Sequence, residues 1–246
     1  MCDVCEMHDL TRRRVFTMGG AGVAAAGLGF GVAPSIALAS ETPDVTPEQA
    51  LRKLQTGNKR FVENALACAS DIKARRGEVA TSQRPWATIL TCSDSRVAPE
   101  LLFGGATLGE LFVIRNAGNL LGVDELGTIE YGAEHLGSSL VLVLGHERCG
   151  AVSAACDVAT KGASVHGAVG KMIQPLIPIA LAAQKSLAAG KGGGDLVTTA
   201  VRMSARATAR RIVAESPLVA EKVAARTLKV VPAYYDLDTG VVEFAI

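Results

Sequence analysis

The chain of 246 residues has little net charge and few cysteines for its length. Its formal net charge is +1, because 25 basic residues nearly balance 24 acidic ones, and this excludes a nucleic-acid-binding surface built on bulk charge. Six cysteines are too few for a disulfide scaffold in so long a chain, so each is interpreted by its position. With 49% hydrophobic residues, the chain can bury a sizeable core, and general disorder is excluded.

Charged residues are also missing from a long stretch near the N-terminus. Residues 15–40 carry no charge and follow a run of three arginines that begins at Arg12. Many glycines and alanines make the stretch weakly hydrophobic, and the small residues at Ala37–Ala39 are typical of a signal-peptidase site. We therefore expect residues 1–39 to be a twin-arginine (Tat) signal peptide. The alternative is an uncleaved membrane anchor.

The Tat interpretation predicts where the protein acts. The domain 40–246 would be periplasmic or otherwise extracytoplasmic, with no stable membrane insertion after the signal is cleaved. The Tat route exports folded proteins, and this suits a protein that acquires a metal in the cytoplasm.

Hydrophobic runs and helical patterns alternate along the rest of the chain. Short apolar runs at 86–91, 111–114 and 140–144 predict buried strands, and helical spacing predicts helices around them. The C-terminal segment predicts a hairpin of two strands, 228–235 and 241–246. This order predicts an α/β fold with a mostly parallel central sheet, flanked by helices and carrying an antiparallel C-terminal edge strand.

Two local signals refine this prediction. Thr46–Gln49 is typical of a capping box with proline in the first helical turn, so we expect a helix to begin there. Pro232 lies inside an expected strand, where its missing N–H should break a hydrogen bond of the ladder. We therefore expect a bulge or an early end of that strand.

Chemically reactive residues gather just after two of the expected strands. Cys92, Asp94 and Arg96 follow the first apolar run, and His146 and Cys149 follow the third. Ligands of open α/β sheets bind beyond the carboxyl ends of the strands. These side chains will therefore converge if the two strands are neighbours in the sheet.

Two cysteines and a histidine favour zinc over harder cations. Three protein ligands leave a fourth position for water, which is the pattern of a catalytic site. Zinc would lower the pKa of that water to about 7. Each residue alone has a simpler interpretation, with Cys92 as a small core residue and Asp94 and Arg96 as an ordinary ion pair. Their combination favours one zinc ion per chain.

Several motifs resemble those of the β-class carbonic anhydrases. Residues 92–97 (CSDSRV) are similar to the first zinc motif of that family, and residues 146–150 (HERCG) to the second. Residues 57–61, 109–119 and 234–240 resemble further segments of the family. The likeness extends over nearly the whole chain after the expected signal.

The resemblance implies a zinc enzyme that reversibly hydrates carbon dioxide to bicarbonate and a proton, by attack of zinc-bound hydroxide. Cys92, His146 and Cys149 would hold the zinc ion. Asp94 would orient the zinc-bound water, and Arg96 would keep the carboxylate of Asp94 off the metal. In a closed state found in some family members, the aspartate instead becomes the fourth zinc ligand, so Asp94 has two candidate roles.

The resemblance also implies a substrate-binding residue and an oligomer. Gln83 stands nine residues before Cys92, where the family has a glutamine that binds substrate; an exposed loop residue is the alternative. The family builds its active sites at a dimer interface, so we expect a homodimer or a multiple of dimers. A bicarbonate-regulated subgroup has tryptophan where this chain has Ile89, and that difference argues against the same regulation.

Other functions and residues stay open at this point. The same zinc site could hydrolyse carbonyl sulfide or carbon disulfide, which are linear molecules like carbon dioxide. A non-catalytic zinc- or bicarbonate-binding protein is a different class of function, and the Asp94–Arg96 pair argues against it. Cys68 and Cys156 could form a disulfide after export or remain free thiols, and His166 could carry protons or lie in a solvated loop.

Overall fold

The computed structural model describes residues 45–63 and 72–246, which belong to one compact unit. The expected signal peptide and Cys68 lie outside these residues. Among the helices described, none is long and apolar enough to cross a membrane.

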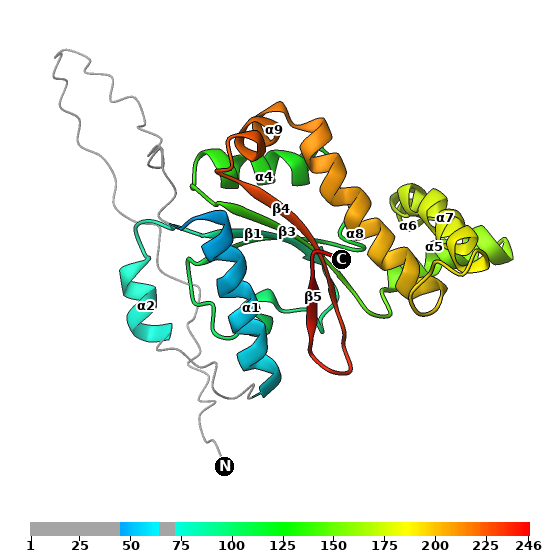
Figure 1. Cartoon of the computed structure of the whole chain (residues 1–246), viewed down its shortest axis with the longest axis horizontal. Helices are drawn as coiled ribbons and strands as arrows, with labels where there is room; N and C mark the ends of the chain where they lie inside the picture. The colour runs from blue at the N-terminus through cyan, green and yellow to red at the C-terminus, as the bar shows by residue number, and fades with distance from the viewer. Residues whose placement is uncertain (1–44, 64–71) are drawn as a thin grey trace, which may run out of the picture. The chain divides into compact units, whose positions relative to one another are not determined.

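The described residues form a five-stranded sheet with the strand order β2-β1-β3-β4-β5. Neighbouring strands are parallel from β2 to β4, and β5 runs antiparallel to β4 (Figure 1). The predicted α/β fold with an antiparallel C-terminal edge is therefore confirmed. The strands are β1 (Ala87–Cys92), β2 (Leu111–Asn116), β3 (Leu140–His146), β4 (Lys229–Tyr235) and β5 (Val242–Phe244).

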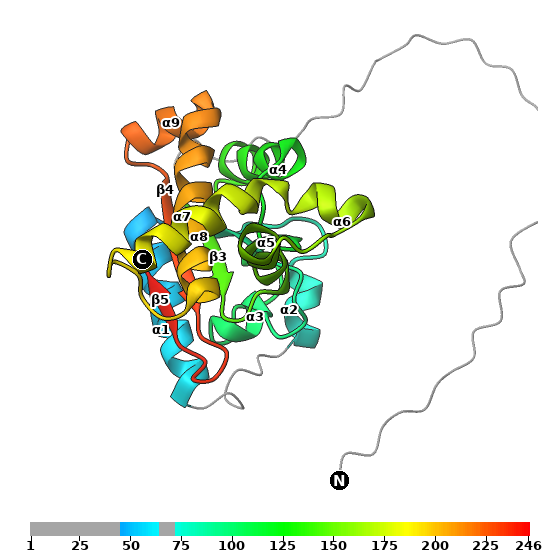
Figure 2. The same ribbon diagram turned by 90° about the vertical axis from the view of Figure 1, so that its right-hand side faces the viewer.

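Helices cover both faces of this sheet. On one face, α1 and α3 share a core cluster with the strands. On the other face, α4, α8 and α9 do so, and α5, α6 and α7 gather around the N-terminal part of α8 (Figures 1 and 2). The helices are α1 (Pro47–Glu63), α2 (Ile72–Glu78), α3 (Pro99–Leu102), α4 (Val123–Glu134), α5 (Gly150–Lys161), α6 (Gly167–Met172), the short 3-10 helix η2 (Gln174–Leu176), α7 (Ile177–Ala188), α8 (Leu196–Glu215) and α9 (Pro217–Ala224).

The two central strands, β1 and β3, are buried along their whole length. Their side chains alternate between the faces, so Ile89 and Leu142 pack in the cluster of α1 while Leu90 and Val143 pack in the cluster of α8. Burying one such aliphatic side chain contributes about 1.5–3 kcal/mol to folding. The ends of β1 and β3 are therefore held in place by strands that are buried on both faces.

Helix α1 begins with the predicted capping box. The Thr46 hydroxyl accepts a hydrogen bond from the Gln49 N–H at 3.2 Å, and the Gln49 side chain accepts one from the Thr46 N–H at 2.8 Å. Further along the helix, the Asn58 amide donates to the carbonyl oxygens of Leu102 and Gly240 and accepts from the Val242 N–H. This one side chain therefore ties α1 to α3 and to the C-terminal hairpin.

The expected break at Pro232 is wrong. Strand β4 runs through Pro232 without interruption and keeps its register with β3. The Lys229 N–H and the Tyr235 carbonyl both bond toward β3, so the alternation of a strand turns the nitrogen of Pro232 away from β3. On that outer side the pairing with β5 begins only at Ala233. The missing N–H therefore falls where the ladder needs no donor.

Candidate metal centre

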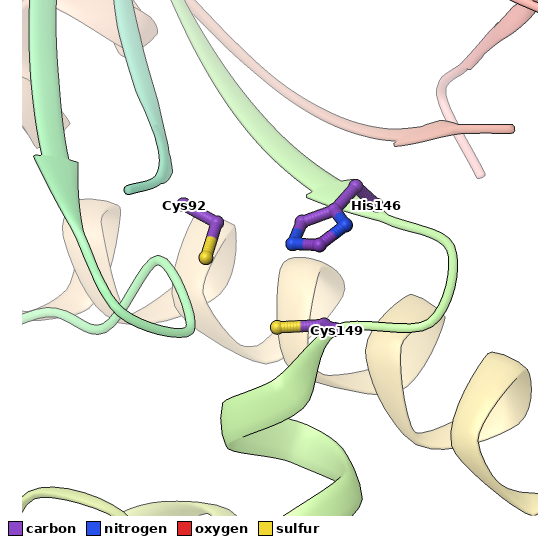
Figure 3. A group of neighbouring side chains, drawn as sticks. All are labelled: Cys92, His146 and Cys149. Carbon is purple, nitrogen blue, oxygen red and sulfur yellow. The ribbon is translucent and has the colours of Figure 1, made fainter. Parts of the chain in front are cut away.

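Three side chains from the carboxyl edge of the sheet point toward one another (Figure 3). Cys92 ends β1 and His146 ends β3, and the two strands are neighbours, as the convergence of these residues requires. Cys149 directly precedes α5 as its N-cap residue. All three residues are buried, and their candidate ligand atoms lie within 4.8 Å of one another.

This separation suits a single zinc ion. Zinc binds sulfur at about 2.3 Å and nitrogen at about 2.0–2.1 Å, so a tetrahedral site places its ligand atoms about 3.5–4 Å apart. Small movements of these side chains would therefore complete the coordination. The donor set of two sulfurs and one nitrogen also matches zinc rather than calcium or magnesium, which prefer oxygen.

The imidazole of His146 is prepared for a metal. Its Nδ1 atom lies 2.8 Å from the carbonyl oxygen of Glu147, and because a carbonyl only accepts, Nδ1 carries the proton. The Nε2 atom is then unprotonated, and its lone pair is available to a metal ion. Nε2 is fully buried and has no hydrogen-bond partner among the described residues. A buried acceptor without a donor is costly, and a metal ion would satisfy it.

The two thiols share their environment. Hydrogen bonds from Cys149 and from the Gly118 N–H, the latter at 3.3 Å, lower the pKa of Cys92 against the opposing effect of burial. The same contact with Cys92, together with burial, raises the pKa of Cys149. Cys92 is therefore the more readily ionised of the two thiols. Zinc would bind both cysteines as thiolates.

Asp94 and Arg96 form a close ion pair beside the three ligands. Arg96 donates from Nε to Oδ1 of Asp94 at 2.9 Å and from Nη2 to Oδ2 at 2.7 Å. The Arg96 N–H adds a third bond to Oδ1 at 3.0 Å. These side-chain bonds hold the pKa of Asp94 well below its usual range. The carboxylate stays ionised, and its Oδ2 atom lies 3.9 Å from Nε2 of His146.

Arg115 is a site residue that the sequence reasoning left without a role. It stands in β2 opposite Thr91, and its guanidinium donates to the carbonyl oxygens of Cys92 at 3.1 Å and of Asp94 at 2.7 Å. These two bonds shape the backbone turn that carries Cys92 and Asp94. Its position in the segment 109–119 was the only sequence signal for this role.

The other candidate residues lie elsewhere or are not brought into the cluster. Gln83 is exposed and precedes the amino end of β1, whereas the cluster lies at the carboxyl end of that strand. His166 is exposed, and its ring lies 3.2 Å from the Ser164 hydroxyl. Cys156 is a buried free thiol in α5.

A buried Cys–His–Cys set beside an ionised carboxylate, at the carboxyl ends of parallel strands, is the arrangement of a catalytic zinc site. Comparison with known proteins agrees. Residues 87–242 match the carbonic anhydrase family. Carbonic anhydrase 2 of Mycobacterium tuberculosis is 33% identical over 198 residues, which cover 80% of this chain and 92% of that protein. The carbonic anhydrase of Mycolicibacterium smegmatis is 34% identical over 201 residues, covering 82% and 94%.

Comparison with solved structures identifies the class within this family. The β-carbonic anhydrase of Coccomyxa, solved in complex with acetazolamide, is 30% identical, with a TM-score of 0.59 over 78% of this chain and 85% of that one. A tetrameric β-carbonic anhydrase of Sordaria macrospora is 23% identical and shares the fold, with a TM-score of 0.62 over 70% and 88% of the two chains. The chain belongs to the carbonic anhydrase family, in its β class.

Proposed function

We propose that this enzyme catalyses the reversible hydration of carbon dioxide to bicarbonate and a proton, with one zinc ion per chain held by Cys92, His146 and Cys149. The observation that carries the proposal is the Asp94–Arg96 pair beside the unpartnered Nε2 atom of His146. A protein that only stores zinc has no need of an ionised carboxylate fixed next to the metal ligands.

Each residue of the site then has a task. Bound zinc would act as a Lewis acid and make water a nucleophile at neutral pH. Asp94 stays ionised and would accept a hydrogen bond from the reacting water, so that its lone pair faces the substrate. Arg96 holds both oxygens of that carboxylate, and Arg115 fixes the turn on which Asp94 stands.

We also propose the setting in which the enzyme works. Residues 1–39 would be a Tat signal, and the enzyme would act in the periplasm. It would be a homodimer or a multiple of dimers, in which Gln83 binds substrate at the site of the neighbouring subunit. The exposure of Gln83 at the opposite end of β1 from the metal ligands supports this arrangement, because the residue is free to reach another chain.

Stopped-flow hydration of carbon dioxide by the purified, zinc-loaded protein tests the proposed reaction. We expect hydration far above the buffer rate, and a loss of about 10²-fold in Asp94→Asn, since a reacting group misplaced by about 1 Å can cost that much. Zinc content should stay at one per chain in both proteins. Full hydration by Asp94→Asn, or hydrolysis of carbonyl sulfide or carbon disulfide without carbon dioxide hydration, would overturn the proposal.

A further inference from the structure

We propose that Glu147 is a positioning residue for the metal centre, bracing the ligand His146 against the turn between β4 and β5. The inference rests on the proposed zinc site and adds to it a support that comes from a segment about 90 residues away in the sequence. Glu147 itself offers no atom to the metal; it acts through the groups that it holds.

The first contact is made by the main chain of Glu147. Its carbonyl oxygen accepts the Nδ1 proton of His146 at 2.8 Å, and this fixes both the tautomer and the plane of the imidazole. Partners of this kind commonly orient metal-binding histidines, and losing one typically costs about 10–100-fold in metal affinity or activity. The direction of the Nε2 lone pair therefore depends on where the Glu147 peptide is held.

Two further groups of Glu147 hold that peptide against the C-terminal hairpin. Its N–H donates to the carbonyl oxygen of Tyr235 at 2.8 Å. Its carboxylate accepts the Leu237 N–H at 3.0 Å through Oε2. The Glu147 side chain is only 18% exposed, so these bonds are partly shielded from water and are worth more than bonds at an open surface.

Arg148 completes the brace. It donates to Oε1 of Glu147 at 2.9 Å and to the two carboxylate oxygens of Asp238 at 2.6 and 2.9 Å. Its φ angle is +52°, a conformation that costs free energy in any residue other than glycine. The contacts with Asp238 link the loop between His146 and Cys149 to the same hairpin.

The turn that receives these bonds is itself fixed. The Oδ1 atom of Asp236 accepts the N–H groups of Asp238 and Thr239 at 3.0 and 2.8 Å and also the Thr239 hydroxyl. An unbroken series of hydrogen bonds thus runs from the turn through Glu147 to the imidazole of His146. Removing the Glu147 carboxylate should loosen the metal ligand without removing any donor atom.

The zinc dissociation constant, measured by competition with a chromophoric chelator, tests this inference. In Glu147→Ala we expect zinc to bind about 10–100-fold more weakly than in the parent, with a smaller loss in Asp238→Asn. The visible absorption bands of the cobalt-substituted protein should change in Glu147→Ala, since they report the ligand geometry. As a matched control, Glu215→Ala removes the exposed pair with Arg211 at the end of α8 and should leave both measurements unchanged.

The result that overturns the inference is equally specific. A support that is merely structural would lower the unfolding temperature of the metal-free protein while the zinc dissociation constant and the cobalt spectrum stayed at parental values. If Glu147→Ala does not fold, unchanged zinc binding in Asp238→Asn would overturn the inference. If the parent binds zinc but does not hydrate carbon dioxide, the proposed function fails, and the comparison of zinc affinities still decides the role of Glu147.

Discussion

The Oδ2 atom of Asp94 lies 3.9 Å from Nε2 of His146, while both oxygens of this carboxylate are hydrogen-bonded to Arg96. The carboxylate is therefore near enough to reach the metal position and is held back from it by one guanidinium. This relationship makes Arg96 the residue that decides what Asp94 does. The Asp94–Arg96 pair also distinguishes a catalytic zinc site from a site that only binds zinc.

Replacing Arg96 with alanine should release Asp94. We expect Arg96→Ala to keep its zinc but to hydrate carbon dioxide at least about 10-fold more slowly, because the freed carboxylate can occupy the fourth position of the metal. A crystal structure of the zinc-loaded variant should show Asp94 on the metal. Arg96→Lys is the matched control for charge, and it should recover part of the activity at most, since lysine cannot hold both oxygens as a guanidinium does. Parental turnover in Arg96→Ala would contradict this role.

Gly57 in α1 should tolerate no side chain. A Cβ atom there would lie 1.9 Å from the Phe103 carbonyl oxygen, whereas one at Gly77 in α2 would meet nothing within 4 Å. We expect Gly57→Ala to lower the free energy of unfolding by about 1–3 kcal/mol through overpacking. Gly77→Ala should be neutral or stabilise by up to about 1 kcal/mol, as alanine does in a helix. Urea unfolding measures the free energy of unfolding of both variants. Equal changes in the two variants would show that α1 does not pack closely against the backbone at Phe103.

Asp195 should make the stability of α8 depend on acid pH. Its carboxylate accepts the Thr198 N–H at 2.7 Å as the N-cap of the helix, and that bond lowers its pKa. Because the folded-state pKa lies below the unfolded value, the contribution is complete above about pH 4 and is lost as the pH falls through the folded-state value.

The variant Asp195→Asn isolates this effect. Asparagine caps a helix about as well as aspartate, so we expect near-parental stability at pH 7 and a weaker loss of stability between pH 5 and 3, a range chosen from the carboxyl values of about 4. Asp195→Ala should cost about 1 kcal/mol at pH 7. Urea midpoints that fall equally steeply with pH in the parent and in Asp195→Asn would disprove the assignment.

The export signal can be tested at its arginines. We expect the double replacement of Arg12 and Arg13 by lysine to leave the precursor in the cytoplasm, because the Tat route depends on the arginine pair. Fractionation of cells that express the full chain measures the location. An unchanged periplasmic yield would contradict a Tat signal. Replacing the arginine pair Arg75 and Arg76 of α2 by lysine is the matched control and should leave export in place.

The strands and the convergence of the metal ligands could be predicted because both depend on local patterns. The apolar run at 140–144 became β3, and parallel strands bring their carboxyl ends to one edge, so Cys92 and His146 had to meet once their strands were neighbours. Whether Pro232 interrupts β4 could not be predicted in the same way. It depends on which side of β4 its nitrogen faces and on how far β5 extends.

The contacts that support the site could not be predicted from the sequence either. Arg115 reaches the Cys92 carbonyl because of the register between β1 and β2. Glu147 meets Leu237 because a distant turn folds back beside the ligand loop. Such contacts depend on tertiary register rather than on spacing along the chain. Motifs therefore identified the candidate metal ligands but missed the groups that position them.

The most direct test of the account is a zinc titration of the metal-free enzyme in which the hydration of carbon dioxide is followed. The account predicts that the rate rises linearly with added zinc and stops rising at one ion per chain. It also predicts that Cys149→Ser shows almost no rise, since a hydroxyl is a poor substitute for a thiolate on zinc, while Cys156→Ser, which removes the buried thiol in α5, follows the parent. Full zinc-dependent hydration in Cys149→Ser would contradict the proposed metal centre.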